Sequence, residues 1–306
     1  MDDVGLVETV LDLTSLGLLN SLGNVHRYGT SLRVRHQALR TKHAAQTAYN
    51  AHHVRGSDNY VVSAGITYAA SYLSRQRERN INILRQYRGD KRYFGARNLL
   101  HDHSIFGTDF VFDTIPNQLV PFDWDEFHKY QGKYLVGVTN AKTGKAEYLD
   151  GMRMDRPCTM LRATCAIPIY FPPVQMDGET YYDGGLADPI PILRSLHDGN
   201  ERNLIVLTQP ESYRKTLGRG VQFTAKWLKR KYPAMPKVLL ERAKHYNETV
   251  CFCHRLAENK PQDTVLLQPE KSLNSFEKDV KKLEWGYEMG YNMTCARMEQ
   301  IKNLFR

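Results

Sequence analysis

Ser63 and Asp183 are the two residues whose types and settings could carry out covalent chemistry. Ser63 follows the apolar run 60–62 and precedes the small residues Ala64 and Gly65. A serine that attacks an acyl carbonyl sits at a sharp strand-to-helix turn, where small neighbours leave room and the first N–H groups of the helix face the developing oxyanion. Serine is also a common helix N-cap. The pattern therefore predicts either an acyl-transfer nucleophile or a structural cap.

Asp183 ends a predicted strand and is followed by Gly184 and Gly185. A strand-end carboxylate lies at the edge where α/β sheets bind ligands, and the glycines let another backbone or a substrate approach closely. Such a carboxylate could take the proton of Ser63 if burial raised its pKa above the ordinary value of about 4. Asp-Gly is also a common turn dipeptide. If the two residues act together, their side chains should lie about 2.6–3.2 Å apart.

The elements that would position these residues alternate between strands and helices from Tyr60 onward. Apolar runs bounded by turn residues predict strands, and longer runs with helical spacing predict helices. This alternation predicts a single α/β domain. The predicted strands are 60–62, 134–140, 145–149, 179–182, 204–208 and 264–267. The predicted helices are 66–75, 96–100, 123–129, 160–164, two or three across 220–260, and 276–305.

The order of several segments resembles that of the patatin-like phospholipases, in particular the bacterial branch of that family. The resemblance extends over roughly residues 60–291. Its most specific parts are the proline-rich segment and the Asp-Gly-Gly that follows it. The segments are V-S-A-G at the elbow, S-I-F-G-T-D-F (104–110), V-G-V-T-N-A-K-T-G (136–144), R-A-T-C-A-I-P-I-Y-F-P-P (162–173), Y-Y-D-G-G-L-A-D-P-I-P (181–191) and V-L-T-Q-P (206–210).

The resemblance implies a three-layer α/β/α sandwich with a mostly parallel central sheet and a helical C-terminal region. It also implies hydrolysis of lipid or lysolipid esters through an acyl-serine intermediate, with a Ser-Asp dyad, no catalytic histidine and no cofactor. Ser63 matches the nucleophile of the family and Asp183 matches its base. The supporting turns are Ala64 and Gly65 at the elbow, which also face the oxyanion, and Gly184 and Gly185 after the base.

The first part of the chain departs from this pattern. The family has a glycine-rich turn of the type G-G-G-x-R after its first strand, but here residues 5–7 are followed by 8–11 without a glycine cluster. Backbone N–H groups converge on an oxyanion only where side chains stay out of the way, and losing one such donor lowers the rate about 10²–10³-fold. Val61 stands where the family elbow has its first glycine, and a β-branched residue there would crowd the turn.

These departures divide the chain into an atypical N-terminal region, 1–59, and a patatin-like domain, 60–306. The segment from Thr9 to Asp58 lacks apolar periodicity and is expected to be the least ordered part. Two functions stay open: a serine lipid acyl hydrolase, and a catalytically impaired relative that binds lipid or membrane without efficient turnover. An unrelated α/β binding protein is a third, generic alternative.

The net charge of +9 is concentrated in one stretch, 212–247, which holds ten basic residues against Glu241 alone. A solvated helical face is the commonest meaning of such a run. Because Phe223, Trp227, Tyr232, Leu239 and Leu240 are interleaved with it, the stretch also predicts peripheral contact with an anionic membrane. No nucleic-acid motif accompanies the charge, so no nucleic-acid partner is expected. The basic residues are Arg214, Lys215, Arg219, Lys226, Lys229, Arg230, Lys231, Lys237, Arg242 and Lys244.

The remaining sequence signals predict a cytoplasmic protein, peripheral on the inner membrane surface. No run of eighteen apolar residues predicts a transmembrane helix, and the first residues do not resemble a signal peptide. The five cysteines show no disulfide or zinc pattern. The pairs His52-His53 and His101-x-His103 lack accompanying carboxylates or cysteines, so neither a metal nor a cofactor is expected.

Overall fold

The computed structural model describes residues 57–274 and 277–305. The atypical N-terminal region lies almost entirely outside them. The expectations for the segment after Val7 and for order between Thr9 and Asp58 therefore stay predictions, as does the division into two regions.

The strands form two sheets, which confirms the predicted α/β class. The larger sheet has the order β1-β2-β5-β4, with β3 also paired to β2, and the smaller sheet contains β6 and β7. The pairs β1–β2 and β6–β7 are parallel and the other pairs are antiparallel, so the sheet is mixed rather than mostly parallel. The strands are β1 Asn59–Val62, β2 Tyr134–Asn140, β3 Ala146–Asp150, β4 Val174–Met176, β5 Glu179–Asp183, β6 Asn203–Val206 and β7 Thr264–Leu267.

Short connections account for the antiparallel pairs β2–β3 and β4–β5. Strands β2 and β3 form the predicted hairpin, in which Gly144 has a φ of +69°. Strands β4 and β5 are joined through Asp177 and Gly178, which both have positive φ. Two positive φ angles are typical of the tight turns that join antiparallel strands, whereas a parallel pair needs a long crossover.

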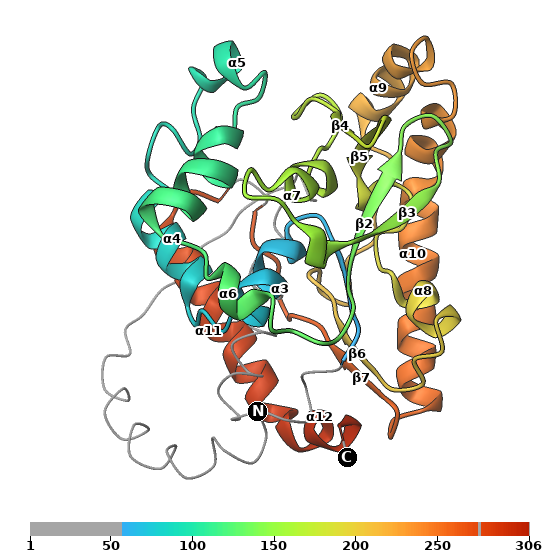
Figure 1. Ribbon diagram of the computed structural model, residues 1–306. Coiled ribbons are helices and arrows are strands. Elements are labelled where there is room, and N and C mark those ends of the chain that lie inside the picture. Colours follow the sequence, from blue (N-terminus) through green and yellow to red (C-terminus); the bar gives the residue numbers. More distant parts are fainter. Residues whose placement is uncertain (1–56, 275–276, 306) are drawn as a thin grey trace.

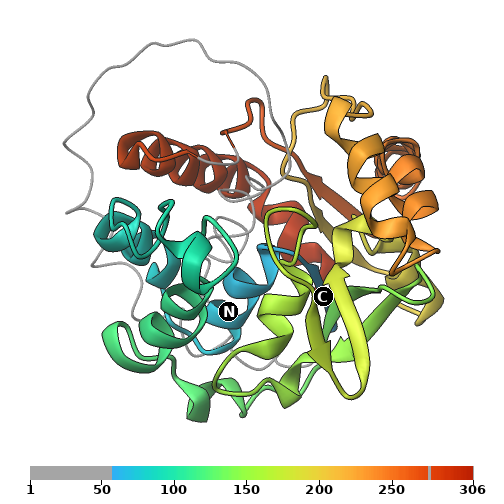
Figure 2. The same cartoon turned by 90° about the horizontal axis from the view of Figure 1, so that it is seen from above.

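Helices cover both sides of the strands, with α3, α4 and α11 on one side and α8 and α10 on the other (Figures 1 and 2). This is the expected layered arrangement. The α-helices are α3 Gly65–Leu73, α4 Arg79–Tyr87, α5 Asn98–His101, α6 Trp124–Phe127, α7 Thr159–Thr164, α8 Ile192–His197, α9 Arg219–Lys229, α10 Met235–Asn259, α11 Val280–Ala296 and α12 Met298–Leu304. A π-helix spans Phe110–Leu119, and 3-10 turns span Gly151–Arg153 and Gly184–Leu186.

The C-terminal region contains a break that the sequence does not predict. The expected terminal helix 276–305 is two helices, α11 and α12, which meet at Arg297. Ile301 and Leu304 on α12 are buried in a cluster with Val265 and Leu267 of β7. The turn at Arg297 thus brings the apolar face of α12 onto the smaller sheet.

Strand β2 is the centre of the main core. Its residues Val136 and Val138 are fully buried, in one cluster with Ile66 and Ala69 of α3. Burying a side chain such as that of valine or isoleucine contributes about 1.5–3 kcal/mol to folding. This packing fixes α3, and therefore the turn that precedes it, against the sheet.

Candidate functional site

Ser63 occupies a strained turn between β1 and α3, as the sequence predicts. Its φ is +55°, a left-handed conformation that non-glycine residues adopt rarely, at a cost of about 1–3 kcal/mol. The N-cap of α3 is Ala64, and no side chain caps this helix end. Ser63 is therefore not a helix cap, and its buried hydroxyl group is directed elsewhere.

The sheet register brings Ser63 and Asp183 together from positions far apart in the sequence. Val62 of β1 pairs with Gly137 of β2, and Asp183 of β5 pairs with Val138. The two strands thus end on either side of the same stretch of β2, approaching it from opposite directions. The Ser63 hydroxyl donates a hydrogen bond to Asp183 Oδ2, with Oγ and Oδ2 2.7 Å apart. This distance lies within the range that the sequence analysis expects.

Asp183 is fully buried, and burial raises its pKa above the ordinary value. Its Oδ1 accepts a hydrogen bond from the backbone N–H of Gly185 at 2.7 Å. Gly184 packs so closely on β2 that a Cβ atom there would lie 2.2 Å from the carbonyl oxygen of Gly137. The Asp-Gly-Gly sequence is therefore more than a turn, because it lets the carboxylate be buried and held by the backbone.

Thr164 is a supporting residue that the sequence analysis did not single out. Its hydroxyl accepts a hydrogen bond from the backbone N–H of Ser63 at 2.9 Å and donates one to the carbonyl oxygen of Gly137 at 2.6 Å. The side chain is fully buried at the end of α7. Thr164 thus ties the strained turn to β2. Its only signal in the sequence is its place in the R-A-T-C-A segment.

Val61 does not crowd the turn. It lies within β1 opposite Val136, and its side chain is buried in the main core. The positive φ belongs to Ser63, two residues further on. The predicted crowding at Val61 is therefore wrong, because a strand position with an inward side chain accepts a β-branched residue readily.

We expect Val61→Gly to destabilise the fold by about 2–4 kcal/mol, since the change removes a buried side chain and adds backbone freedom to a strand. Denaturant unfolding measures this as a lower midpoint. An unchanged midpoint would mean that Val61 does not pack as described.

Two family profiles match the chain. Residues 62–195 match that of the patatin-like phospholipases, and this range includes both Ser63 and Asp183. The chain contains a patatin-like phospholipase domain. Residues 232–306 match a domain of unknown function. No curated protein matches the chain.

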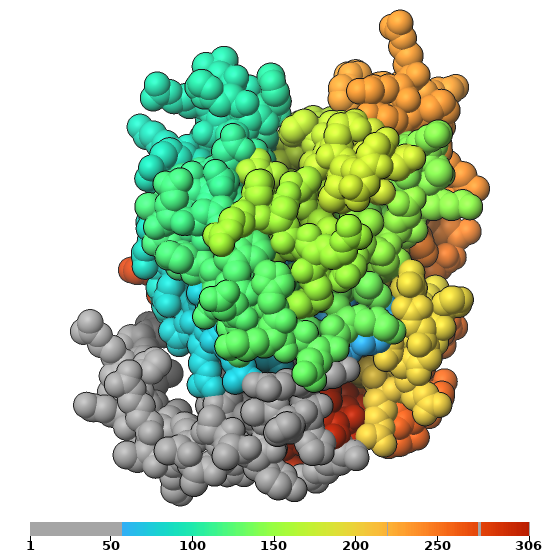
Figure 3. Space-filling model, in the orientation of Figure 1, coloured from blue at the N-terminus to red at the C-terminus, as the bar shows by residue number. Residues whose placement is uncertain are grey.

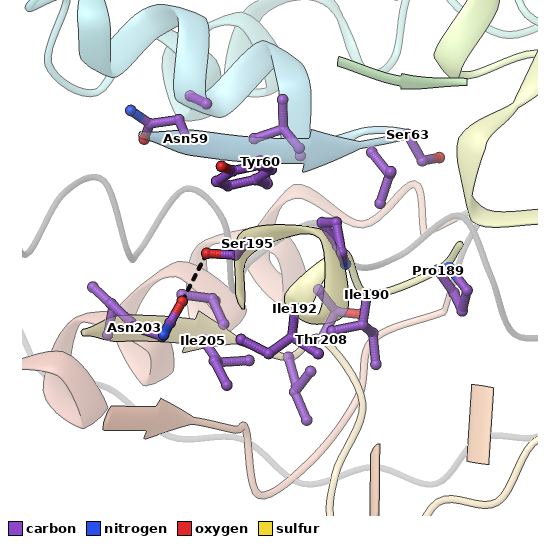
Figure 4. A pocket seen from close by; sticks show the side chains of 18 of the residues that line it. Asn59, Tyr60, Ser63, Pro189, Ile190, Ile192, Ser195, Asn203, Ile205 and Thr208 are labelled. Carbon is purple, nitrogen blue, oxygen red and sulfur yellow. Dashed lines mark hydrogen bonds between the residues drawn. The ribbon is translucent and has the colours of Figure 1, made fainter. Parts of the chain in front are cut away.

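A pocket of about 460 Å³ opens beside the elbow of the patatin-like domain. Figure 4 shows Ser63 at the end of β1, with β1 and β6 running in the same direction on opposite sides of the pocket. Ile190, Ile192 and Ile205 contribute apolar walls. Within the described residues, β1 pairs only with β2 and β6 only with β7, so both strands turn an unpaired edge to the pocket.

The elbow also presents backbone donors. The Ser63 N–H donates a hydrogen bond to the Thr164 hydroxyl, whereas the N–H groups of Ala64 and Gly65 make no hydrogen bond to the described residues. Both residues line the pocket. They are in the positions that the sequence analysis assigns to oxyanion stabilisation.

Two cations beside Asp183 were not predicted as part of the site. Lys215 lies in the loop before α9 and lines the pocket, with Nζ 5.0 Å from the ring centroid of Tyr246. Burial, with a smaller contribution from Arg242, lowers the pKa of Lys215 to about 7. Arg242 on α10 donates from Nε to the carbonyl oxygen of Gly185 at 2.8 Å. No feature of the sequence separates these two from the other basic residues of 212–247.

The described ranges contain no group of three His, Cys, Asp or Glu side chains arranged to hold a metal ion. The pair His52-His53 lies outside these ranges. No helix within 57–274 or 277–305 is long and apolar enough to cross a bilayer.

Proposed function

We propose that the protein hydrolyses lipid or lysolipid esters with Ser63 as nucleophile and Asp183 as its general base. The observation that supports this most strongly is the 2.7 Å hydrogen bond between a strained serine and a fully buried carboxylate. A general base must lie within hydrogen-bond reach of the proton that it removes. Burial also raises the pKa of Asp183, which makes its carboxylate a stronger base.

In the first half-reaction, Ser63 Oγ attacks the carbonyl carbon of the ester while Asp183 Oδ2 takes the hydroxyl proton. The tetrahedral intermediate then collapses, the bond to the alcohol oxygen breaks, and the leaving alcohol takes the proton from Asp183. An acyl-serine ester remains. In the second half-reaction, water attacks this ester and gives a proton to Asp183, and the proton returns to Ser63 as the fatty acid leaves.

The oxyanion of each intermediate would lie near the N–H groups of Ala64 and Gly65, at the N-terminal end of α3. Preorganised backbone donors of this kind stabilise the charge that develops in the transition state. The acyl chain would extend along the apolar walls of the pocket, where Ile190 and Ile192 contribute methyl groups. Neither step uses a histidine or a metal ion.

Fatty acid release from lysophosphatidylcholine tests this proposal. Purified protein is incubated with the lipid, and the free fatty acid is quantified by mass spectrometry over time. Release that is linear in protein concentration and saturates with substrate supports the hydrolase. Lipid binding without release would instead support the second function below.

A catalytically impaired protein that binds lipid or membrane is the second candidate. The observation that favours it is the absence of a glycine-rich turn after residues 5–7. Such a turn would bring further N–H donors to the oxyanion, in addition to those of Ala64 and Gly65. If these donors are missing, turnover falls by about 10²–10³-fold for each of them. The pocket and the apolar contacts would still bind an acyl chain.

We further propose that helix α9 attaches the protein to anionic membranes. Phe223 and Trp227 lie one turn apart on this helix and are 68% and 58% exposed. Lys226, Lys229 and Arg230 are exposed beside them. We call these five residues the α9 face. The α9 region projects beyond the neighbouring surface in the space-filling view (Figure 3). Exposed aromatic rings next to basic residues suit a surface of anionic lipid headgroups.

The predicted aromatic and basic stretch thus divides in two. Tyr232 and Leu239 are buried in the core, so they are not available to a membrane. Leu240 is 43% exposed. Lys215 and Arg242 face the catalytic pair. The membrane proposal therefore rests on the α9 face and not on the whole of 212–247.

We expect the protein to bind phosphatidylglycerol vesicles more tightly than phosphatidylcholine vesicles, with affinity that falls as salt rises. Exposed charges are screened over about 8–10 Å at physiological ionic strength. The variant K226E/K229E should lose most of this binding, and Trp227→Ala should weaken it on both kinds of vesicle. Trp285→Ala is the matched control, because Trp285 is also exposed but lies on α11. Vesicle co-sedimentation measures each case, and equal binding to neutral and anionic vesicles would remove the membrane proposal.

A further inference from the structure

Arg242 connects the C-terminal region to the catalytic pair through a short chain of hydrogen bonds. Its Nε donates to the carbonyl oxygen of Gly185, and the N–H of the same glycine donates to Asp183 Oδ1. A Cβ atom at Gly185 would lie 3.0 Å from Asp183 Oδ1 and 3.8 Å from an Arg242 terminal nitrogen. Gly185 is thus held between the carboxylate and the guanidinium group. Arg242 lies on α10, within the range 232–306 that matches a domain of unknown function.

The buried carboxylate needs positive charge nearby. Asp183 is 0% exposed, and burial alone disfavours its ionised form. The charged and titratable groups that act on it come from three elements: Arg242 on α10, Lys215 in the loop before α9, and the Cys165 thiol after α7. Tyr213 faces Arg242 on the side of the Lys215 loop. Arg242 exerts the largest of the effects that favour the carboxylate.

The two cations differ in the pH range over which they stay charged. The pKa of Lys215 is lowered to about 7, so this side chain loses much of its charge near neutral pH. A guanidinium group stays protonated throughout the physiological range, even when burial lowers its pKa. Arg242 is therefore the cation beside Asp183 that stays fully charged at neutral and higher pH.

We propose that Arg242 is a positioning residue for the Ser63–Asp183 pair: it holds the Gly184–Gly185 turn in place and supplies the positive charge that keeps the buried Asp183 ionised. The region that matches a domain of unknown function would thus complete the catalytic site of the patatin-like domain. This inference rests on the proposed function of the pair. On this inference, the C-terminal region supports the catalytic pair as well as covering the sheet.

The direct test is to titrate Asp183 itself. NMR monitors the titration in protein whose aspartates are labelled at the carboxyl carbon, and the Asp183 signal is assigned by its absence from Asp183→Asn. In Arg242→Gln, the midpoint should rise by about one pH unit or more, since a nearby opposite charge lowers the pKa of a carboxyl group by about 1–3 units. Arg242→Lys keeps the charge and should shift the midpoint less. Arg255→Gln removes the same charge from an exposed position on the same helix and should leave the midpoint unchanged.

A second readout is the pH dependence of ester hydrolysis, whose acid limb should move to higher pH in Arg242→Gln. At a pH below both midpoints, kcat/KM should fall about tenfold for a one-unit shift. If the Gln variant does not fold, Arg242→Met replaces it, because its apolar stem suits a partly buried position. An unchanged Asp183 midpoint in a folded neutral variant would overturn the inference. A shifted midpoint in a protein that hydrolyses no lipid would leave the inference standing and refute the hydrolase proposal.

Discussion

Replacing Ser63 with alanine should lower ester hydrolysis by at least about 10³-fold while leaving the fold and vesicle binding unchanged. The hydroxyl oxygen forms the bond to the acyl group, so no other group can substitute for it in the proposed mechanism. The α9 face is a different part of the surface, and it should bind anionic vesicles as before. Hydrolysis of a soluble p-nitrophenyl ester and co-sedimentation with phosphatidylglycerol vesicles measure the two properties separately.

Ser212→Ala is the matched control, because Ser212 is exposed and lies outside the pocket lining. It should hydrolyse the ester at the rate of the unmodified protein. Alanine at position 63 retains the left-handed backbone at similar cost, so any large loss of stability in Ser63→Ala would point to a structural role of the hydroxyl group. Hydrolysis that survives in Ser63→Ala would show that another residue is the nucleophile.

Asp183→Asn should reduce hydrolysis by about 10²–10⁴-fold, which is the usual contribution of a general base. An amide has nearly the same shape: its oxygen can still accept the hydrogen bond from the N–H of Gly185, and its NH2 group can donate to Ser63 Oγ. The variant should therefore keep the geometry and lose only the basic group. The rate of the unmodified protein should rise with pH through the raised pKa of Asp183, and this dependence should be absent from the residual activity of the variant.

The same substitution should make the fold more stable at neutral pH. The folded-state pKa of Asp183 lies above its unfolded value, so the folded protein binds this proton more tightly than the unfolded chain. The resulting destabilisation is absent below the unfolded pKa and fully present above the folded pKa. Asparagine removes it. A lower melting temperature for Asp183→Asn at pH 7 would mean that the buried carboxylate is net stabilising, through Arg242 and its hydrogen bonds.

The proximity of Ser63 and Asp183 could be predicted because both residues carry strong local signals. A serine between an apolar run and two small residues indicates a tight turn, and glycines after Asp183 indicate a close backbone approach. The hairpin around Gly144 was predictable for the same reason. Each of these signals lies within a few residues, where backbone preferences act directly.

Other parts of the site could not be found in this way, because they depend on tertiary packing. A lysine or arginine in a basic run carries no sign of whether it faces solvent, and only the packing of α10 separates Arg242 from its exposed neighbours. Nothing in the sequence distinguishes Thr164 from the other threonines, because its role depends on the packing of α7 against β2. The antiparallel pairing of β5 with β2 and β4 could not be predicted, because strands of three and five residues give only a weak signal in the sequence.

Labelling by a fluorophosphonate probe, with the modified residue identified by peptide mass spectrometry, tests the central claim most directly. The probe reacts with a serine that a nearby base has activated, and it needs no knowledge of the natural lipid. The account predicts labelling of the unmodified protein at Ser63 alone, greatly slowed in Asp183→Asn. An absence of labelling in the folded, unmodified protein, or labelling of Ser63 at the same rate in Asp183→Asn, would contradict it.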